Sequence, residues 1–156
     1  MNQVFAGGCA CAAVRYRLTS PPMFTHCCHC SDCQRQTGGA FAINALIETD
    51  RIEMMKGQLT AIEMPSPSGR GHEIYRCPQC QTALWSNYGR RAWMRFVRVA
   101  TLDDQHAIEP DAHIFTRSKV PWVRIPEQHR AFEVFYDLAA TWPPESLARR
   151  EAAAKS

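Results

Sequence analysis

The stretch that decides the fold reads Cys28-His29-Cys30-Ser31-Asp32-Cys33. On an extended chain Cys28 and Cys30 share one face, whereas Cys27 points to the other. Three thiolates around one Zn²⁺ leave a fourth position open, which is the arrangement of catalytic zinc. Such a site carries one net negative charge, so it is a weaker Lewis acid than a zinc site with three histidines. It should suit a soft sulfur ligand better. We therefore predict a catalytic zinc on Cys28, Cys30 and Cys33 that takes a substrate thiol.

Two further cysteine pairs lie on either side of this stretch. Cys77-Pro78-Gln79-Cys80 has the spacing of a zinc knuckle, which supplies only two of four ligands. Cys9 and Cys11 complete the set, because residues i and i+2 of a strand project from the same face. We predict a closed structural zinc site on Cys9, Cys11, Cys77 and Cys80, and hence two zinc ions per chain.

Several alternatives stay open on the residues alone. Cys27 could complete a second site of four cysteines or be an ordinary buried thiol. His26 and His29 lie where a metal ligand could lie. The CxxC pairs, or Cys27 with Cys28, could instead serve redox chemistry.

Composition sets the class of protein. The chain has 156 residues, 46% hydrophobic and 21% charged, with a net charge of +3, which indicates one soluble globular domain. Its longest apolar run, Cys9 to Val14, has six residues, far fewer than the roughly 20 that span a bilayer. The first residues lack the form of a secretory signal, so we expect a cytoplasmic protein, in which eight cysteines indicate metal or redox chemistry rather than disulfides.

The region before residue 125 reads as a mainly β domain. Apolar residues alternate with arginines, and turn signals separate the segments. The predicted strands are 13–18, 41–47, 59–64 and 94–99. We expect antiparallel sheets.

The pattern changes after Pro126. Phe132, Phe135, Tyr136 and Ala139 recur at helical spacing, which predicts an amphipathic helix. Pro143-Pro144 predicts the start of a second helix that runs through Ala154. Residues 126–156 would thus be a helical extension of the β domain formed by residues 1–125.

Four blocks of the sequence together resemble the glutathione-dependent formaldehyde-activating (GFA) family, which includes centromere protein V. The blocks are Gly7–Tyr16, Cys28–Gly38, Arg76–Thr82, and His113–Phe115 with Ser118–Trp122. Their order and spacing agree over about residues 4 to 125. The resemblance implies a β-tent of antiparallel sheets with zinc knuckles at their junctions. It also implies a structural zinc on Cys9, Cys11, Cys77 and Cys80 and a catalytic zinc on Cys28, Cys30 and Cys33.

The chain departs from the family pattern at two knuckles. Where GGCHCG is usual, it has Ala10 and Ala12, and where glycine is usual after Cys80 it has Gln81. No proposed ligand is lost. The departures leave the identity of the substrate open.

The resemblance implies a zinc-dependent carbon-sulfur lyase. Such an enzyme condenses formaldehyde with glutathione to S-hydroxymethylglutathione, or acts on a related thiol adduct. Glutathione carries two carboxylates, which arginine can bind with two parallel hydrogen bonds. Arg35 is our first choice for that role, and the turn at Thr37 and Gly38 could offer backbone N–H donors.

The alternative is a zinc-ribbon-like module that binds nucleic acid or protein without catalysis. Six arginines alternate with aromatic residues between Gly69 and Arg98. Arginine with aromatics can pair phosphates and stack bases. Alternating strands give the same pattern with aromatics inward and arginines outward, so we expect no nucleic-acid partner.

Overall fold

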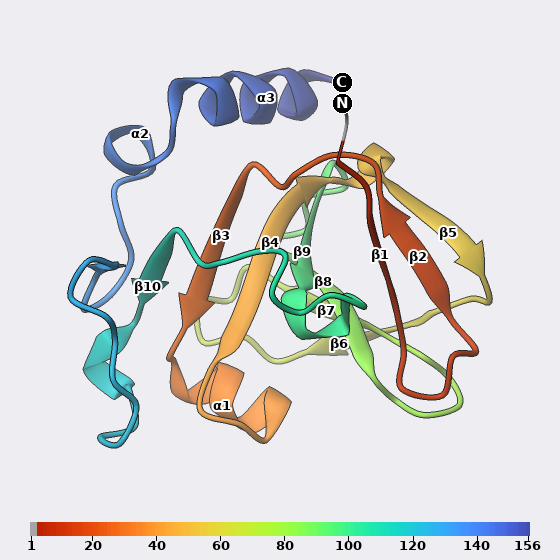
Figure 1. Ribbon diagram of the computed structural model, residues 1–156, viewed down its shortest axis with the longest axis horizontal. Helices are drawn as coiled ribbons and strands as arrows, with labels where there is room; N and C mark the ends of the chain where they lie inside the picture. Colours follow the sequence, from red (N-terminus) through yellow and green to blue (C-terminus); the bar gives the residue numbers. More distant parts are fainter. Residues whose placement is uncertain (1–2) are drawn as a thin grey trace.

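The computed structural model describes residues 3–156, whose strands form two β-sheets (Figure 1). The smaller sheet has three antiparallel strands in the order β1-β2-β5. They are β1 (Phe5–Gly8), β2 (Arg15–Leu18) and β5 (Ile52–Lys56). In β2 the residues Tyr16 and Leu18 are buried and Arg17 is exposed, as the predicted alternation requires.

The larger sheet has eight strands in the order β11-β10-β3-β4-β9-β8-β7-β6. Its strands are β3 (Phe24–Cys28), β4 (Ala42–Glu48), β6 (Thr60–Met64), β7 (His72–Arg76), β8 (Ala83–Tyr88), β9 (Met94–Arg98), β10 (Ala112–Ile114) and β11 (Arg130–Ala131). The prediction of a mainly β fold is confirmed. All-antiparallel pairing is wrong at one edge, because β10 runs parallel to both β3 and β11. A long connection from β9 brings β10 to that edge in the direction of β3, as parallel neighbours require.

Two hydrophobic clusters hold the sheets. The first lies between them and contains Tyr16 and Trp85, whose rings meet edge to face at 5.3 Å. The second contains Phe24 and Trp142, whose rings stack at 5.3 Å. The C-terminal segment therefore contributes to the core of the β domain. The boundary at residue 125 stays a prediction.

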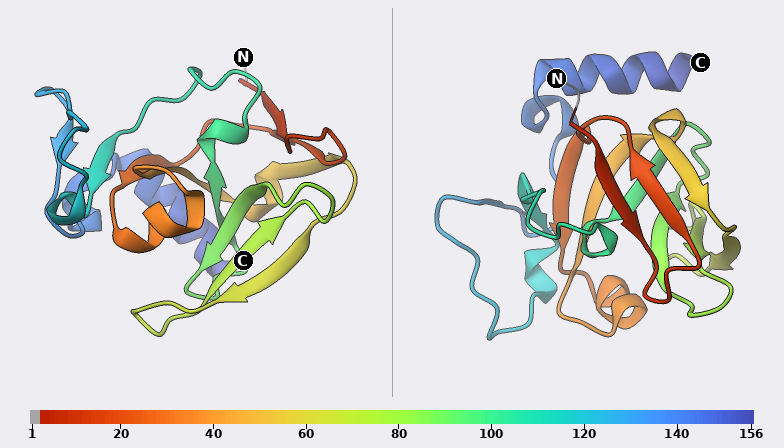
Figure 2. Two further views of the ribbon diagram at one scale, coloured as in Figure 1. Left: turned by 90° about the horizontal axis from the view of Figure 1, so that it is seen from below. Right: turned by 45° about the vertical axis from the view of Figure 1, so that its right-hand side comes forward.

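Short helices occupy the ends of the strands. Helix α1 (Ser31–Thr37) follows β3 directly, and three short 3-10 helices follow β4, β9 and β10. These are η1 (Thr49–Arg51), η2 (Val99–Thr101) and η3 (Thr116–Ser118). Figure 1 shows α1 and the C-terminal helix at opposite ends of β3 and β4, and the turned views in Figure 2 agree.

The helix predicted over Phe132–Ala139 is wrong. Residues 130–131 form β11, and the only helix in this stretch is α2 (Leu138–Thr141). The backbone N–H of Phe132 donates to the carbonyl of His113, and the N–H of Phe115 donates to the carbonyl of Val134. Pairing with a distant segment uses the groups that a helix would need, and it outweighs local periodicity.

The second predicted C-terminal helix is confirmed as α3 (Pro144–Lys155). Arg149 anchors it through two hydrogen bonds of 2.8 and 2.7 Å to the buried carboxylate of Glu48. Although burial alone would raise the pKa of Glu48, the hydrogen bonds from Arg149 hold it below its ordinary value. Over residues 3–156, no helix combines the length and the apolar character of a membrane span.

Candidate metal centres and the adjoining pocket

The first sulfur cluster joins the two sheets. Cys9 and Cys11 follow β1 of the smaller sheet, and Cys77 and Cys80 lie between β7 and β8 of the larger one. The sulfurs of Cys9 and Cys11 are 3.5 Å apart, and those of Cys11 and Cys77 are 3.8 Å apart. Sulfurs bound tetrahedrally to one Zn²⁺ at about 2.3 Å would be about 3.8 Å apart. All four are free thiols, and the cluster has the size that zinc requires.

Two tight turns build this four-sulfur cluster. The prediction that Cys9 and Cys11 lie on a strand is wrong, because they lie in a turn in which the N–H of Ala12 donates to the carbonyl of Cys9. In the second turn the N–H of Gln81 donates to the carbonyl of Cys77. Ala12 and Gln81 adopt left-handed backbone with φ of 60° and 64°. These are two of the positions at which the sequence departs from the family pattern, and left-handed backbone explains why glycine is usual there.

Hydrogen bonds at the second turn favour the thiolate form. The hydroxyl of Thr82 lies 3.1 Å from the sulfur of Cys80. This hydrogen bond, with a second from the backbone of Thr82, lowers the pKa of Cys80 to about 5. A thiolate is the form in which cysteine binds metal.

The second cluster lies where β3 passes into α1. Cys28 ends β3, Cys30 is the N-cap of α1, and Cys33 lies in the first turn of that helix. Their sulfurs all lie within 4.8 Å of one another. Hydrogen bonds from the thiols of Cys28 and Cys33 lower the pKa of Cys30 to about 2. The N–H of Cys33 also donates to the sulfur of Cys30 at 3.3 Å, which favours negative charge on that sulfur.

The neighbouring residues lie apart from this three-sulfur cluster. Cys27 points to the other face of β3, where it meets His29 and His113. Burial raises the pKa of Cys27 to about 12. His26 is buried beside Tyr136, with its Nδ1 atom 3.3 Å from the phenol oxygen, and burial lowers its pKa to about 4. Neither Cys27 nor His26 joins the three sulfurs.

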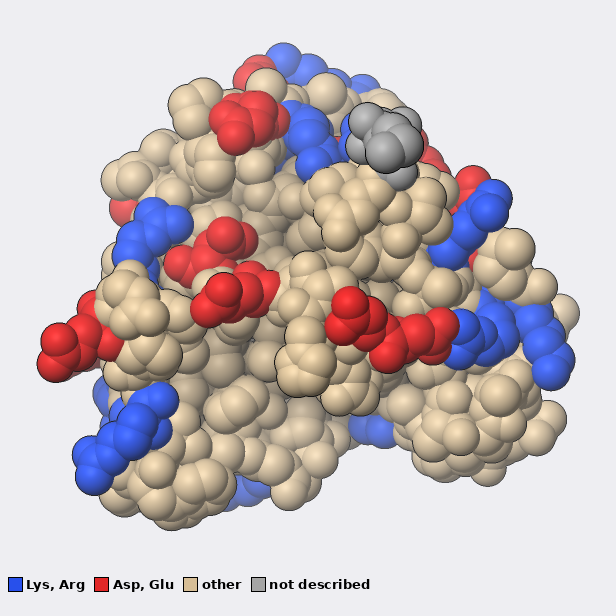
Figure 3. All heavy atoms as spheres, in the orientation of Figure 1, with Lys and Arg blue, Asp and Glu red and all other residues tan. Residues whose placement is uncertain are grey.

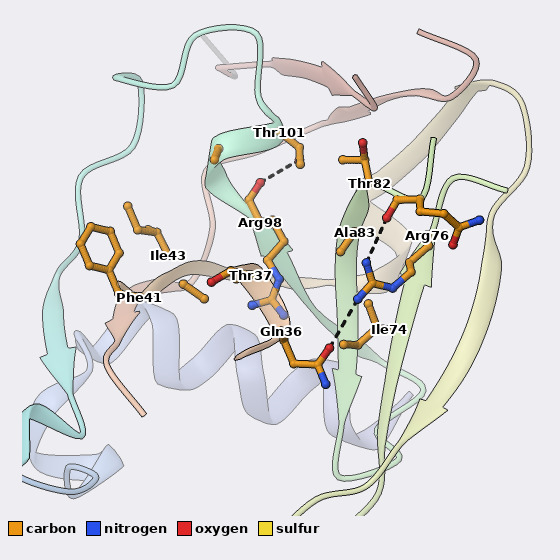
Figure 4. Close-up of a pocket in the computed structure, with 13 residues that line it drawn as sticks. Gln36, Thr37, Phe41, Ile43, Ile74, Arg76, Thr82, Ala83, Arg98 and Thr101 are labelled. Carbon is orange, nitrogen blue, oxygen red and sulfur yellow. Dashed lines mark hydrogen bonds between the residues drawn. The ribbon is translucent and has the colours of Figure 1, made fainter. Parts of the chain in front are cut away.

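A pocket of about 380 Å³ opens beside α1 at the ends of β7 and β9 (Figure 4). Arg76 and Arg98 end those strands, and Figure 4 shows their guanidinium groups directed into the pocket. Arg98 is only 8% exposed. One of its Nη atoms donates to Asn44, while its buried Nε atom has no hydrogen-bond partner among residues 3–156.

Arg98 also connects the pocket to the three-sulfur cluster. Burial lowers the pKa of Arg98, and the sulfurs of Cys33, Cys28 and Cys30 oppose that shift. Arg76 donates to the carbonyl of Gln81 at 3.0 Å and to the side chain of Gln36 at 3.4 Å. Within the described part of the chain, neither arginine forms an ion pair with a carboxylate. The pocket is therefore suited to an anion.

Of the three residues predicted to bind the substrate, only Thr37 lies in the pocket. Thr37 lines the pocket, whereas Arg35 is exposed on α1 and does not line it. Gly38 ends α1 with φ of 67°, and its N–H donates to the carbonyl of Gln34. That N–H group is already used within the chain.

Sequence reasoning missed Arg76 and Arg98. Each continues the alternation of a buried face, since Arg76 follows Ile74 at i+2 and Arg98 follows Met94 at i+4. Strand period alone could have placed both arginines inward.

The arginines between Gly69 and Arg98 do not gather into one basic surface. Arg90 pairs with Glu63 at 2.9 Å, Arg95 donates to backbone carbonyls, and Arg98 is buried. Figure 3 shows acidic and basic side chains mixed on the face that it presents. The observed arrangement does not favour a nucleic-acid groove.

Comparisons with known proteins agree with the resemblance. Residues 4–118 match the family model described as "Glutathione-dependent formaldehyde-activating enzyme". A Halomonas elongata protein named "Putative glutathione-dependent formaldehyde-activating enzyme" is 32% identical over 151 residues, which cover 91% of this chain and 90% of the relative. A Rhodobacter sphaeroides crystal structure has a TM-score of 0.49 and 22% identity over 67% of this chain and 91% of its own. On the family match and the Halomonas relative, the chain belongs to the glutathione-dependent formaldehyde-activating enzyme family.

Proposed function

We propose that this protein is a zinc-dependent carbon-sulfur lyase that joins formaldehyde to glutathione. The observation that carries the proposal is the pocket lined by Arg76 and Arg98, because Arg98 is also close enough to Cys28, Cys30 and Cys33 for the charge of their sulfurs to raise its pKa. The family and the name of the Halomonas relative support glutathione and formaldehyde as substrates. The cytoplasmic location stays an expectation.

We assign a structural zinc to Cys9, Cys11, Cys77 and Cys80, and a catalytic zinc to Cys28, Cys30 and Cys33. Their sulfur-only donor sets and close spacing fit this metal. A zinc ion at the three-sulfur cluster would supply an open position that favours thiolate over thiol in a bound substrate.

The protein's own residues bind and orient the substrate. Arg98 and Arg76 bind carboxylates of glutathione, because their guanidinium groups face the pocket without an acidic partner among residues 3–156. Thr37 borders the same space. This arrangement holds the substrate sulfur toward Cys28, Cys30 and Cys33 and restricts its motion before the reaction. Arg35 and Gly38 stay predictions, and we assign the carboxylates to the two pocket arginines instead.

The reaction itself is an addition without oxidation or reduction. The sulfur of glutathione forms a bond to the carbonyl carbon of formaldehyde, the thiol proton leaves the sulfur, and the former carbonyl oxygen gains a proton. The product is a hydroxymethyl thioether, and cleavage of its carbon-sulfur bond is the reverse reaction.

The test compares zinc content and glutathione affinity in the wild type and in Cys30→Ser. We expect the variant to hold one zinc fewer than the wild type, to lose glutathione binding and to keep its fold by circular dichroism. Cys27→Ser is the matched control for glutathione affinity alone, because Cys27 lies on the face of β3 opposite to Cys28 and its replacement should leave that affinity unchanged. Unaltered glutathione binding in Cys30→Ser would refute the metal-thiol step.

A further inference from the structure

A third group of donor side chains lies outside both sulfur clusters. Cys27 of β3 and His113 of β10 are register partners in parallel strands, so their side chains share one face of the sheet. His29 lies two residues after Cys27 and points to the same face. The three residues each offer one ligand atom, and these atoms lie within 4.8 Å of one another.

This Cys27–His29–His113 cluster is buried. The exposed fractions are 1% for Cys27, 0% for His29 and 8% for His113. The ring nitrogen of His29 that faces His113 is Nε2, whereas Nδ1, the nitrogen without a hydrogen-bond partner within residues 3–156, points elsewhere. Nε2 of His29 is therefore the atom that belongs to the cluster.

The surroundings of His113 match those of a metal ligand. Its Nε2 atom lies 3.1 Å from Nδ1 of His129, and Nε2 of His129 lies 3.0 Å from a carboxylate oxygen of Glu109. With both rings neutral, the carboxylate accepts from His129 Nε2–H, and His129 Nδ1 accepts from His113 Nε2–H. This assignment leaves a lone pair on His113 Nδ1, which faces His29 at 2.9 Å. Metal-binding histidines are commonly oriented by such a chain ending in a carboxylate.

We propose that Cys27, His29 and His113 form a third metal site, which binds Zn²⁺ in preference to magnesium and calcium. One thiolate and two imidazoles are borderline-soft donors, which zinc prefers and which magnesium and calcium do not. The site fixes β10, a strand that pairs with β3 over only three residues. Because Cys27 and His29 face away from Cys28, the backbone of β3 separates this site from the catalytic cluster.

The test counts zinc in the full-length protein at equilibrium with micromolar free Zn²⁺. We expect three zinc ions per chain in the wild type and two in Cys27→Ser and in His113→Gln. His26→Gln is the matched control, because His26 is a buried histidine of the same strand outside the cluster. It should keep all three ions.

Zinc-edge X-ray absorption gives a second measurement. The wild type should show the multiple-scattering pattern of imidazole, which the two sulfur clusters cannot produce, and Cys27→Ser should lose it. Glutathione binding should persist in Cys27→Ser, so failure of this site and failure of the proposed function are distinguishable. Equal zinc content in the wild type, Cys27→Ser and His113→Gln, without an imidazole signal, would overturn the proposal.

Discussion

Replacing Arg98 with methionine should weaken glutathione binding without unfolding the protein. Methionine keeps most of the length of the buried side chain and removes its charge and its donors. Arg98 already donates one hydrogen bond to Asn44, and its guanidinium group lines the pocket without a carboxylate partner among residues 3–156. Hydrogen bonds to charged groups contribute about 1.5–3 kcal/mol. The dissociation constant of glutathione should therefore rise about 10- to 150-fold, at 1.4 kcal/mol for each factor of ten.

The assay is calorimetric titration of the zinc-loaded protein with two thiols. Glutathione carries carboxylates, whereas 2-mercaptoethanol carries none and keeps the thiol. If Arg98 binds a carboxylate, the affinity of 2-mercaptoethanol should change by no more than about twofold in Arg98→Met, within the usual error of additivity. The comparison separates carboxylate binding from any effect of Arg98 on the nearby sulfurs.

Arg95→Met supplies the control on the same strand. Arg95 lies on the opposite face of β9, with its guanidinium over the ring of Tyr75, so this change should leave glutathione affinity unaltered. An equal loss of affinity for both thiols in Arg98→Met would show that Arg98 acts on the metal cluster or the fold. That result would remove the carboxylate site from the proposal.

Three further predictions concern stability. Arg149→Met should lower the free energy of unfolding in urea by about 2–3 kcal/mol, since it leaves the carboxylate of Glu48 buried without its main partner. As the control, Lys155→Met breaks an exposed ion pair on the same helix and should lower the free energy of unfolding by less than about 0.5 kcal/mol. Equal effects of the two changes would contradict the role of burial. The pKa of Glu48 is lower in the folded protein than in the unfolded chain, so the ionised carboxylate stabilises the fold fully above the unfolded pKa of about 4.3. This stabilisation is lost as the pH falls through the folded pKa. The free energies of unfolding of the wild type and Glu48→Gln should therefore converge in acid. Ala12→Gly and Gln81→Gly should each stabilise the protein by about 0.5–1 kcal/mol, because relief of the left-handed backbone strain exceeds the entropy cost of glycine. A lower melting temperature in both variants would show that the turns are not strained.

The cysteine clusters could be predicted from the sequence because the cysteines within each motif are close together along the chain. Cys28, Cys30 and Cys33 come together through a strand end and one helical turn, and both features follow from neighbouring residues. The two knuckle pairs could be joined because a closed zinc site needs four ligands. The structure brings the same four sulfurs together.

What the sequence could not predict depends on long-range pairing. Phe132 and Tyr136 have the spacing of one helix face but do not form a helix, since the backbone there pairs with residues near His113. The approach of His113 to Cys27 depends on a parallel register between strands far apart in the chain. No local pattern specifies such a register.

The four-sulfur cluster also has a consequence for how the chain folds. Cys11 and Cys77 are 66 positions apart, so their contact closes a long loop, although the entropy cost rises only slowly with loop length. The Cys77–Cys80 knuckle needs only its own turn to capture an ion, and β1 and β2 can then dock onto a preformed half-site. We expect the supply of zinc during synthesis to govern how fast the N-terminal strands assemble onto the rest of the protein.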